Sequence, residues 1–235
     1  MIKSLQLLIK AFGQLIFPHT CSACGSDTLH PDAGVCSSCL YQLPLTGYHQ
    51  QNGNAVEEIF WGRITLQHAA ACCFFTKKSR VQSIMHQVKY NHRKDAALQI
   101  GEFMGHQLLS ASWLPDVDLL LPMPLHKKRL YQRGYNQASL LCEGMESVIK
   151  IPLLTTAISR RNETISQTSQ QRSDRWENMQ NVFEVSEPDK LAGKHVLLVD
   201  DVVTTGATLE AMGEQLLRVP ELKLSIYCFA YTLPH

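Results

Sequence analysis

The chain has 235 residues, of which 45% are hydrophobic and 18% are charged, and its formal net charge is +1. These values are ordinary for a soluble globular protein with enough apolar material for a sizeable core. The near-neutral total excludes a surface that is positive throughout, although local basic patches can still attract nucleic acid or phosphates.

An amphipathic helix is predicted at the start of the chain, where apolar residues between positions 2 and 17 follow helical spacing. The segment contains Lys10 and Gln14, is too short to span a bilayer, and leads into Pro18 without a small-residue cleavage site. We expect its apolar face to pack against the body of the protein; contact with a membrane surface is the alternative. With no export signal and no transmembrane segment recognised, a cytoplasmic location is expected.

Four of the eight cysteines form two Cys-x-x-Cys pairs, Cys21 with Cys24 and Cys36 with Cys39. In a reducing cytoplasm, clustered thiols are more often metal ligands than disulfides. Four thiolates suit tetrahedral Zn²⁺, and Gly25 allows the tight turn that points backbone amides at sulfur. We predict a compact zinc ribbon with a structural ion, since four protein ligands leave no open position. An iron site, two redox pairs and a metal-free cluster are the alternatives.

The cysteine pattern ends at residue 39, and the polar stretch 48–54, rich in Gln, Asn and Gly, is predicted to be a loop or linker with almost nothing to bury. We therefore divide the chain into an N-terminal helix with a zinc ribbon, residues 1–60, and a second domain, residues 61–235. Helices that alternate with short apolar strands predict an α/β domain with a largely parallel sheet, which binds ligands at the carboxyl ends of its strands. The predicted helices are 81–87 and 95–109, and the predicted strands are 117–121, 196–199 and 224–230.

A basic stretch lies between residues 77 and 94, although the chain as a whole is nearly neutral. Phosphate contacts supply most of the nonspecific affinity for nucleic acid, and an aromatic ring can stack on an unpaired base. Single-stranded DNA is therefore a reasonable partner, and a solvated helix face is the alternative. The candidate DNA-binding residues are Lys77, Lys78, Arg80, Lys89, Tyr90, Arg93 and Lys94.

Residues 160–181 are polar almost throughout and lack a clear core face. Long loops of this kind in compact domains tend to be lids or binding loops. A lid over a ligand site and plain surface disorder are the two interpretations.

The most informative segment is an apolar strand that leads into Asp200, Asp201 and a hydroxyl-rich turn before a helix. At the amino end of a helix, unpaired N–H groups and the helix dipole favour an anion. Gly206 lets the backbone approach a ligand closely, and neighbouring threonines add hydroxyl donors. We expect a monophosphate cradle, with the two acids accepting hydrogen bonds from a ribose diol. A capped helix without a ligand is the alternative, and a Walker A loop is excluded because Gly-x-x-x-x-Gly-Lys does not occur.

All thirteen positions from 196 to 208 resemble the signature with which type I phosphoribosyltransferases bind 5-phosphoribosyl-1-pyrophosphate (PRPP). With the cysteine pairs and a further block, nearly the whole chain resembles the ComF family, which includes competence protein F and GntX-like proteins. That block begins with Pro122-Met123-Pro124-Leu125 and ends with Arg133-Gly134-Tyr135-Asn136-Gln137. The resemblance implies a type I phosphoribosyltransferase-like α/β fold, with helices flanking a mainly parallel sheet and an appended zinc ribbon. It also implies a link to the uptake of transforming DNA, with a DNA-uptake helicase as a candidate partner.

The resemblance assigns roles to particular residues. Arg129 and Arg133, which share one helix face, are the expected cations for the pyrophosphate together with Mg²⁺, and a solvated basic helix end is the alternative. If the protein is an enzyme, these arginines and the acid pair are its catalytic residues. The PRPP-binding residues are Asp200, Asp201, Val202, Val203, Thr204, Thr205, Gly206, Ala207, Thr208, Pro124 and Leu125. The residues that match a hood loop closing over PRPP are Gln167, Arg172 and Asn178.

Two functions remain open at this point. The first is a PRPP-binding protein that handles single-stranded DNA during natural transformation. The second is a Mg²⁺-dependent phosphoribosyltransferase acting on an unidentified base or nucleotide acceptor, without a role in DNA uptake. A purely regulatory sensor is less supported, because nothing in the chain resembles an output domain.

Overall fold

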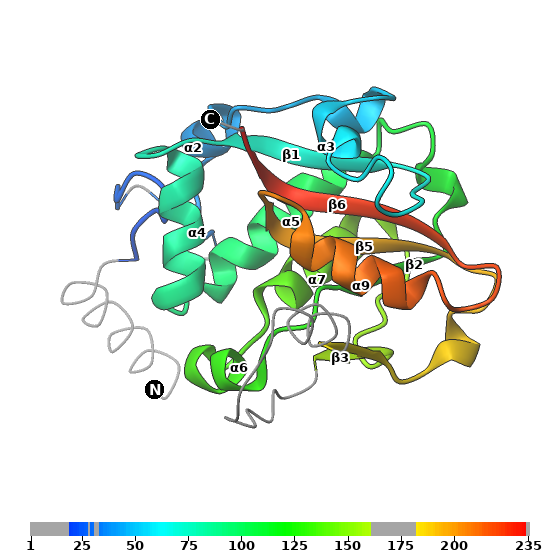
Figure 1. Cartoon of the computed structure of the whole chain (residues 1–235). Helices are drawn as coiled ribbons and strands as arrows, with labels where there is room; N and C mark the ends of the chain where they lie inside the picture. The colour runs from blue at the N-terminus through cyan, green and yellow to red at the C-terminus, as the bar shows by residue number, and fades with distance from the viewer. Residues whose placement is uncertain (1–18, 28, 31–32, 161–181, 234–235) are drawn as a thin grey trace, which may run out of the picture.

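The computed structural model describes residues 19–27, 29–30, 33–160 and 182–233 (Figure 1). The amphipathic helix expected at residues 2–17 lies outside these ranges. Among the helices that are described, none combines the length and the apolar character needed to cross a membrane.

A four-stranded, fully parallel sheet forms the centre of the molecule, in the order β1-β6-β5-β2. Its two middle strands are buried along most of their length because their sequences are apolar on both faces, as expected for a parallel sheet covered by helices. The strands predicted at 196–199 and 224–230 are confirmed within β5 and β6, and the strand predicted at 117–121 is confirmed as β2, which begins two residues later and ends one residue later. The strands are β1 (Ala69–Phe75), β2 (Leu119–Pro122), β5 (His195–Val203) and β6 (Lys223–Thr232).

The edge strand β1 was not predicted from the sequence. Its residues read Ala-Ala-Ala-Cys-Cys-Phe-Phe, and alanine has a low intrinsic preference for strands. The strand forms because it pairs along its length with β6, from Ala69 beside Ile226 to Phe75 beside Thr232. Pairing between segments so far apart leaves no local signal in the sequence.

Helices cover both faces of the sheet (Figure 1). Alternate side chains of β5 enter two separate cores: Leu197 packs with residues of α4, α5 and α7, whereas Leu198 packs with residues of α9. The predicted helices at 81–87 and 95–109 are confirmed as α4 and α5. The covering helices are α4 (Arg80–Tyr90), α5 (Lys94–Leu108), α7 (Gln137–Ile149) and α9 (Ala207–Leu216).

Short elements complete the described chain. A small antiparallel sheet pairs β3 with β4 on either side of the polar segment 161–181, and α6 follows the carboxyl end of β2. These elements are α2 (Ser37–Tyr41), η1 (Tyr48–Gln50), α3 (Ala55–Glu58), η2 (Leu114–Asp116), α6 (Lys127–Arg133), β3 (Ile158–Arg160), β4 (Phe183–Val185) and η3 (Pro188–Lys190).

The cysteine segment packs directly against the amino-terminal part of α5. Gly34 lies so close to Ala96 that an added Cβ would overlap the backbone there. The side-chain oxygen of Gln99 accepts hydrogen bonds from the backbone amides of Gly34 and Val35, at 2.9 and 2.7 Å. Val35 and Cys39 are buried in the same core as α4 and α5. The domain boundary at residue 60 stays a prediction, with extensive packing between the two proposed parts.

Residues 48–54 are held more tightly than a linker. The Asn54 side chain caps α3 and donates a hydrogen bond of 2.9 Å to the carbonyl of Ala69 in β1. His49 and Asn54 are only 5% exposed, and the Tyr48 ring packs edge-on against Phe74. The sequence is polar here because these side chains satisfy buried backbone groups, which composition alone does not distinguish from solvent exposure.

Candidate ribose-phosphate site

The predicted phosphate loop lies at the carboxyl end of β5. The strand is longer than expected, so Asp200 and Asp201 belong to its last residues rather than to the turn. Gly206 then adopts a φ of 74°, a conformation that favours glycine, and caps the amino end of α9. The side chains of Thr204, Thr205 and Thr208 are exposed around this helix end. The loop therefore presents hydroxyl groups and a helix amino terminus to solvent.

Asp201 is neutralised by a residue from another part of the chain. Its Oδ2 lies 2.8 Å from the Nζ of Lys89 on α4 and accepts a hydrogen bond of 3.2 Å from the Nε2 of Gln137 on α7. The Asp201 side chain is 10% exposed and that of Lys89 is 24% exposed, so solvent screens this ion pair only partly. Two adjacent carboxylates would repel a phosphate bound nearby, and Lys89 removes part of that repulsion.

Asp200 has a different environment from its neighbour. Burial and the nearby charge of Asp201 raise the pKa of Asp200 from 3.8 to about 8, because both disfavour its ionised form. The backbone amide of Asp201 donates a hydrogen bond of 2.8 Å to Asp200 Oδ1 and opposes this shift. The acid pair thus combines one paired carboxylate with one carboxyl group that stays protonated up to near-neutral pH.

The loop after β2 lies beside the acid pair. The amide of Met123 donates a hydrogen bond of 2.8 Å to the carbonyl of Val199, just before Asp200. Asn136 caps α7 by accepting from the amide of Ala138, and its Nδ2 donates to the Met123 carbonyl at 2.9 Å. Asn136 is thus a capping residue that also fixes this loop, and the partly exposed Pro124 and Leu125 follow within it.

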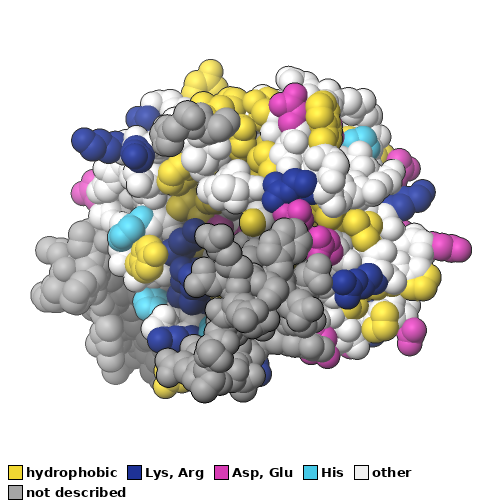
Figure 2. Space-filling view, in the orientation of Figure 1, with side chains coloured by type: hydrophobic (Ala, Val, Ile, Leu, Met, Phe, Trp, Pro, Cys, Tyr) yellow, Lys and Arg dark blue, Asp and Glu magenta, His cyan; other side chains and the backbone are white. Residues whose placement is uncertain are grey.

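Arg129 and Arg133 both lie on α6, as predicted, and both face a groove of about 420 Å³ between the ends of α4 and α6. Arg133 donates a hydrogen bond of 2.8 Å to the Oε1 of Gln137, and its guanidinium lies 5.7 Å from the centre of the Tyr90 ring. In Figure 2, basic side chains and histidines gather over this part of the surface. The groove is lined by Lys89, Tyr90, His92, Arg129, Gln132 and Arg133.

The residues predicted to contact DNA do not form one patch. Lys89 and Tyr90 line the groove, whereas Lys77, Lys78 and Arg80 are exposed at the opposite end of α4, which spans eleven residues. An α-helix of that length is roughly 16 Å long. The sequence could not separate these two groups, because it showed only that the basic residues were close together along the chain.

The last two predicted DNA-binding residues, Arg93 and Lys94, have contacts within the protein. Arg93 pairs with Asp95 at 2.7 Å and donates to the backbone carbonyls of Thr20 and Gly34, beside the cysteine segment. Lys94 places its Nζ 5.3 Å from the centre of the Tyr135 ring. Arg93 therefore has a structural contact that links α5 to the cysteine segment.

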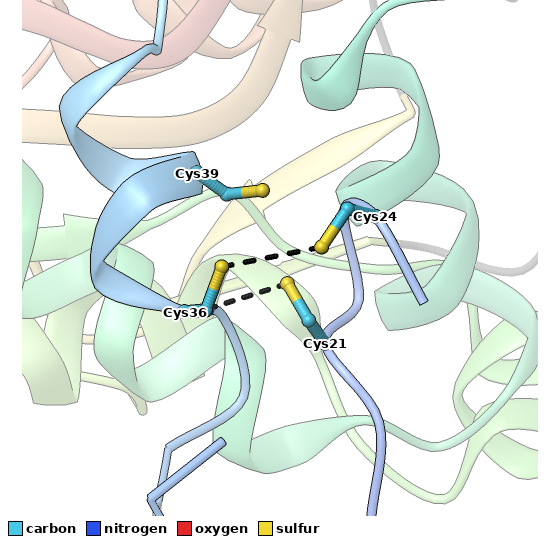
Figure 3. Close-up of side chains that lie close together, drawn as sticks. All are labelled: Cys21, Cys24, Cys36 and Cys39. Carbon is cyan, nitrogen blue, oxygen red and sulfur yellow. Dashed lines mark hydrogen bonds between the residues drawn. The ribbon is translucent and has the colours of Figure 1, made fainter. Parts of the chain in front are cut away.

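The four cysteines converge as predicted (Figure 3). Their sulfur atoms all lie within 4.8 Å of one another, which suits a tetrahedron of thiolates around an ion with bonds of about 2.3 Å. The backbone amide of Cys36 points at the sulfur of Cys21, 3.3 Å away, and that of Ala23 does so at 3.4 Å. Burial acts to raise the pKa of Cys21, but these hydrogen bonds outweigh it and lower the pKa to about 6. The cluster could hold a metal ion, and four thiolates favour Zn²⁺.

Two features of this site were missed from the sequence. Lys89 was assigned to DNA alone, and Gln137 was named only as part of the block that carries the family resemblance, so neither was expected to contact Asp201. The predicted hood residues Gln167, Arg172 and Asn178 lie outside the described residues.

The fold and the site define a protein with a phosphoribosyltransferase domain: residues 136–232 match the family model of the phosphoribosyl transferase domain. The DNA utilization protein YhgH of Escherichia coli K12 is 28% identical over 217 residues, which cover 91% of this chain and 90% of that protein. Competence protein F of Haemophilus influenzae is 29% identical over 215 residues, which cover 91% and 85% respectively. These relatives confirm the resemblance to the competence protein F family.

Among solved structures, the fold is similar to that of a glutamine PRPP amidotransferase from B. subtilis. The TM-score is 0.45 and the sequence identity is 13%, over 62% of this chain and 30% of that one.

Proposed function

We propose that this protein binds PRPP at the carboxyl ends of β5 and β2, and that it acts on single-stranded DNA during the uptake of transforming DNA in the cytoplasm. In this proposal the helix end at residues 204–208 binds the 5-phosphate, and the acid pair binds the ribose hydroxyls. The pyrophosphate faces Arg129 and Arg133. The names of the relatives, DNA utilization protein and competence protein F, support the role in DNA uptake.

The contact network between the acid pair and the basic groove carries the proposal. Gln137 contacts both Asp201 and Arg133, and Lys89 both pairs with Asp201 and lines the groove. One connected set of side chains therefore joins the residues suited to a sugar with the cations suited to a phosphate. PRPP has a phosphate at one end of its ribose and a pyrophosphate at the other. It therefore matches a site in which hydrogen-bond donors of the helix end, the acid pair and the cations of the groove follow one another.

Mg²⁺ is expected to enter with the ligand rather than to reside in the protein. Mg²⁺ prefers carboxylate and phosphate oxygens, and it offsets the charge of a pyrophosphate. Asp201 is already paired with Lys89, so Asp200 is the carboxyl group that would face the ion, and it would give up its proton when the ion binds. The chemistry that Mg²⁺ supplies in this proposal is stabilisation of the pyrophosphate charge.

Thermal unfolding with and without PRPP and Mg²⁺ tests the ligand. A ligand that binds only the folded protein raises the melting temperature. We expect PRPP with Mg²⁺ to stabilise the wild type, and the double change Asp200→Asn with Asp201→Asn to abolish the effect. Asp189→Asn, which removes one charge from an exposed position away from β5, is the matched control. Equal shifts in the double variant and the control would refute the proposed site.

Single-stranded DNA is proposed to bind along the groove, with Tyr90 stacking on a base and the arginines contacting phosphates. Each phosphate contact contributes about −0.7 to the slope of log affinity against log salt for a single strand. Arg129→Gln with Arg133→Gln should therefore flatten that slope by about 1.4, measured by anisotropy of a labelled oligonucleotide. The control is Lys77→Gln with Lys78→Gln at the far end of α4, which should change the slope less. A larger change in slope for the lysine variant than for the arginine variant would show that DNA binds outside the groove.

Turnover of PRPP is the second candidate function, because the acid pair and the loop signature are intact. Incubation of the protein with PRPP, Mg²⁺ and either single-stranded DNA or the common bases, followed by an assay for pyrophosphate, tests it. Release that depends on one acceptor would identify an enzyme. Stabilisation by PRPP without release under any of these conditions would favour a binding role. A DNA-uptake helicase remains the proposed protein partner.

A further inference from the structure

The segment after α3 packs against the side of the phosphate loop. Phe60 is 1% exposed, and Ile59 and Phe60 both lie next to Gly206. A Cβ added at Gly206 would come within 2.7 Å of the Ile59 Cγ2 and 2.9 Å of the Phe60 ring. This close packing, with the positive φ of Gly206, leaves no room for a side chain at that position.

Arg63, from the same segment, holds the loop by its backbone. Its Nη1 donates a hydrogen bond of 2.9 Å to the carbonyl of Thr205 and one of 3.0 Å to the carbonyl of Ile59. Its Nη2 pairs with the carboxylate of Glu210 in the first turn of α9. One guanidinium thus connects the segment after α3, the loop and the helix that follows the loop.

The hydrogen bond to Thr205 fixes the direction of the next amide. A trans peptide is planar, with its C=O and N–H groups on opposite sides of the chain. Because Arg63 holds the Thr205 carbonyl, the N–H of Gly206 in the same peptide must point away from Arg63. The amides at the start of a helix have no partner within the helix, so this orientation leaves the group available to an anion.

We propose that Arg63 is a positioning residue for the phosphate loop: it orients the Thr205–Gly206 peptide so that the Gly206 N–H donates to the phosphate of the ligand. The inference rests on the proposed ribose-phosphate site and adds a residue outside the signature at 196–208. Arg63 does not touch the ligand, and Glu210 neutralises its charge. The planar guanidinium places donors on separate nitrogens, which lets it reach a carboxylate and two carbonyls at once, whereas the three donors of a lysine share one nitrogen and make it a poorer substitute.

Arg63→Gln, Arg63→Lys and the control Arg218→Gln test this role. Arg218 follows α9 and contacts Gln215, so the control removes an equal charge at the other end of the helix. Calorimetry with ribose 5-phosphate should show an affinity about tenfold weaker for Arg63→Gln than for the wild type. The reason is that the hydrogen bond from the Gly206 N–H to the ionised phosphate becomes misaligned. The affinity of Arg63→Lys should lie between that of Arg63→Gln and that of the wild type. The affinity of Arg218→Gln should stay within about twofold of the wild type, as expected for a charge farther from the phosphate than the screening length.

The backbone order of Gly206, measured by ¹⁵N NMR relaxation without ligand, gives an independent readout. The order parameter of the Gly206 amide should be lower in Arg63→Gln than in the wild type and unchanged in Arg218→Gln, because only Arg63 holds the Thr205 carbonyl of the same peptide. If the Arg63→Gln protein does not fold, Arg63→Lys carries the same comparison. An unchanged order parameter at Gly206 in both Arg63 variants would overturn the inference, whether or not ribose 5-phosphate binds. Failure of the wild type to bind that probe, with a lower order parameter in the variants, would refute the proposed ligand and leave the positioning of the peptide supported.

Discussion

Replacement of Asp200 by asparagine is expected to stabilise the ligand-free protein while it weakens ligand binding. The pKa of Asp200 is raised from 3.8 to about 8 in the folded protein, by burial and by the charge of Asp201. At pH values between 3.8 and about 8, Asp200 is therefore ionised in the unfolded chain but protonated in the folded chain. The folded state therefore loses stability as pH rises from about 4 to about 8, and the loss is complete above the folded pKa.

The size of the effect follows from the pKa difference. One pKa unit corresponds to about 1.4 kcal/mol, so a shift from 3.8 to about 8 sets an upper limit of roughly 6 kcal/mol. Asp200 is partly exposed at the strand end, and solvent there reduces the effect, so we expect about 2 kcal/mol at pH 8. Asparagine is uncharged at every pH and keeps an oxygen to accept the 2.8 Å hydrogen bond from the Asp201 amide.

Urea unfolding of the wild type and of Asp200→Asn at pH 5, 6, 7 and 8 measures this difference. The free energy of unfolding of Asp200→Asn should exceed that of the wild type by more at each higher pH, and the two values should converge as the pH approaches 4. Asp189 is exposed, so the free energy of unfolding of Asp189→Asn should differ from that of the wild type by the same amount at every pH in this range. A variant that is less stable than the wild type at pH 8, or a difference that does not change with pH, would refute the reasoning.

Three other predictions concern contacts that hold the site together. Lys89→Met should lower stability by about 3 kcal/mol in urea unfolding, because the nearly buried Asp201 loses its ion pair. Adding Asp201→Asn should restore most of this loss, and no restoration would show that Lys89 acts through packing instead. Gly34→Ala should cost about 2 kcal/mol or more, since its Cβ would overlap the backbone of Ala96; an unchanged midpoint would contradict the close packing. Removal of metal by a chelator should release about one Zn²⁺ per chain, counted by elemental analysis, and lower the melting temperature. Purified protein that contains no metal and has four titratable thiols in this cluster would argue against a zinc site.

Local sequence patterns were sufficient for the parts of the molecule whose residues are close together along the chain. The Cys-x-x-Cys pairs predicted a cluster, and the sulfur atoms of Cys21 and Cys39 come together as expected. The apolar run at 196–199 followed by acids, threonines and Gly206 predicted a strand, a loop and a helix, and all three are present. These predictions held because the motifs depend on turn geometry and hydrogen bonding within a few residues.

Contacts between distant segments required the tertiary structure. The hydrogen bond between Arg63 and Thr205 joins residues 142 positions apart, and Lys89 reaches Asp201 from a different helix. The sequence placed Lys89 in a basic stretch and could not show that its charge is used inside the protein. Periodicity reports which face of an element is apolar, but it does not report which element packs on that face.

The sequence by itself thus determined the type of fold, the cysteine cluster and the position of the loop between β5 and α9. Only the tertiary structure decided the charge state of the acid pair, because that state depends on burial and on a lysine brought in by α4. It also divided one basic stretch into a groove beside the site and a separate group at the other end of α4. The physical reason is that local geometry is set by neighbouring residues, whereas electrostatics in a folded site are set by whichever groups the packing of the whole chain brings together.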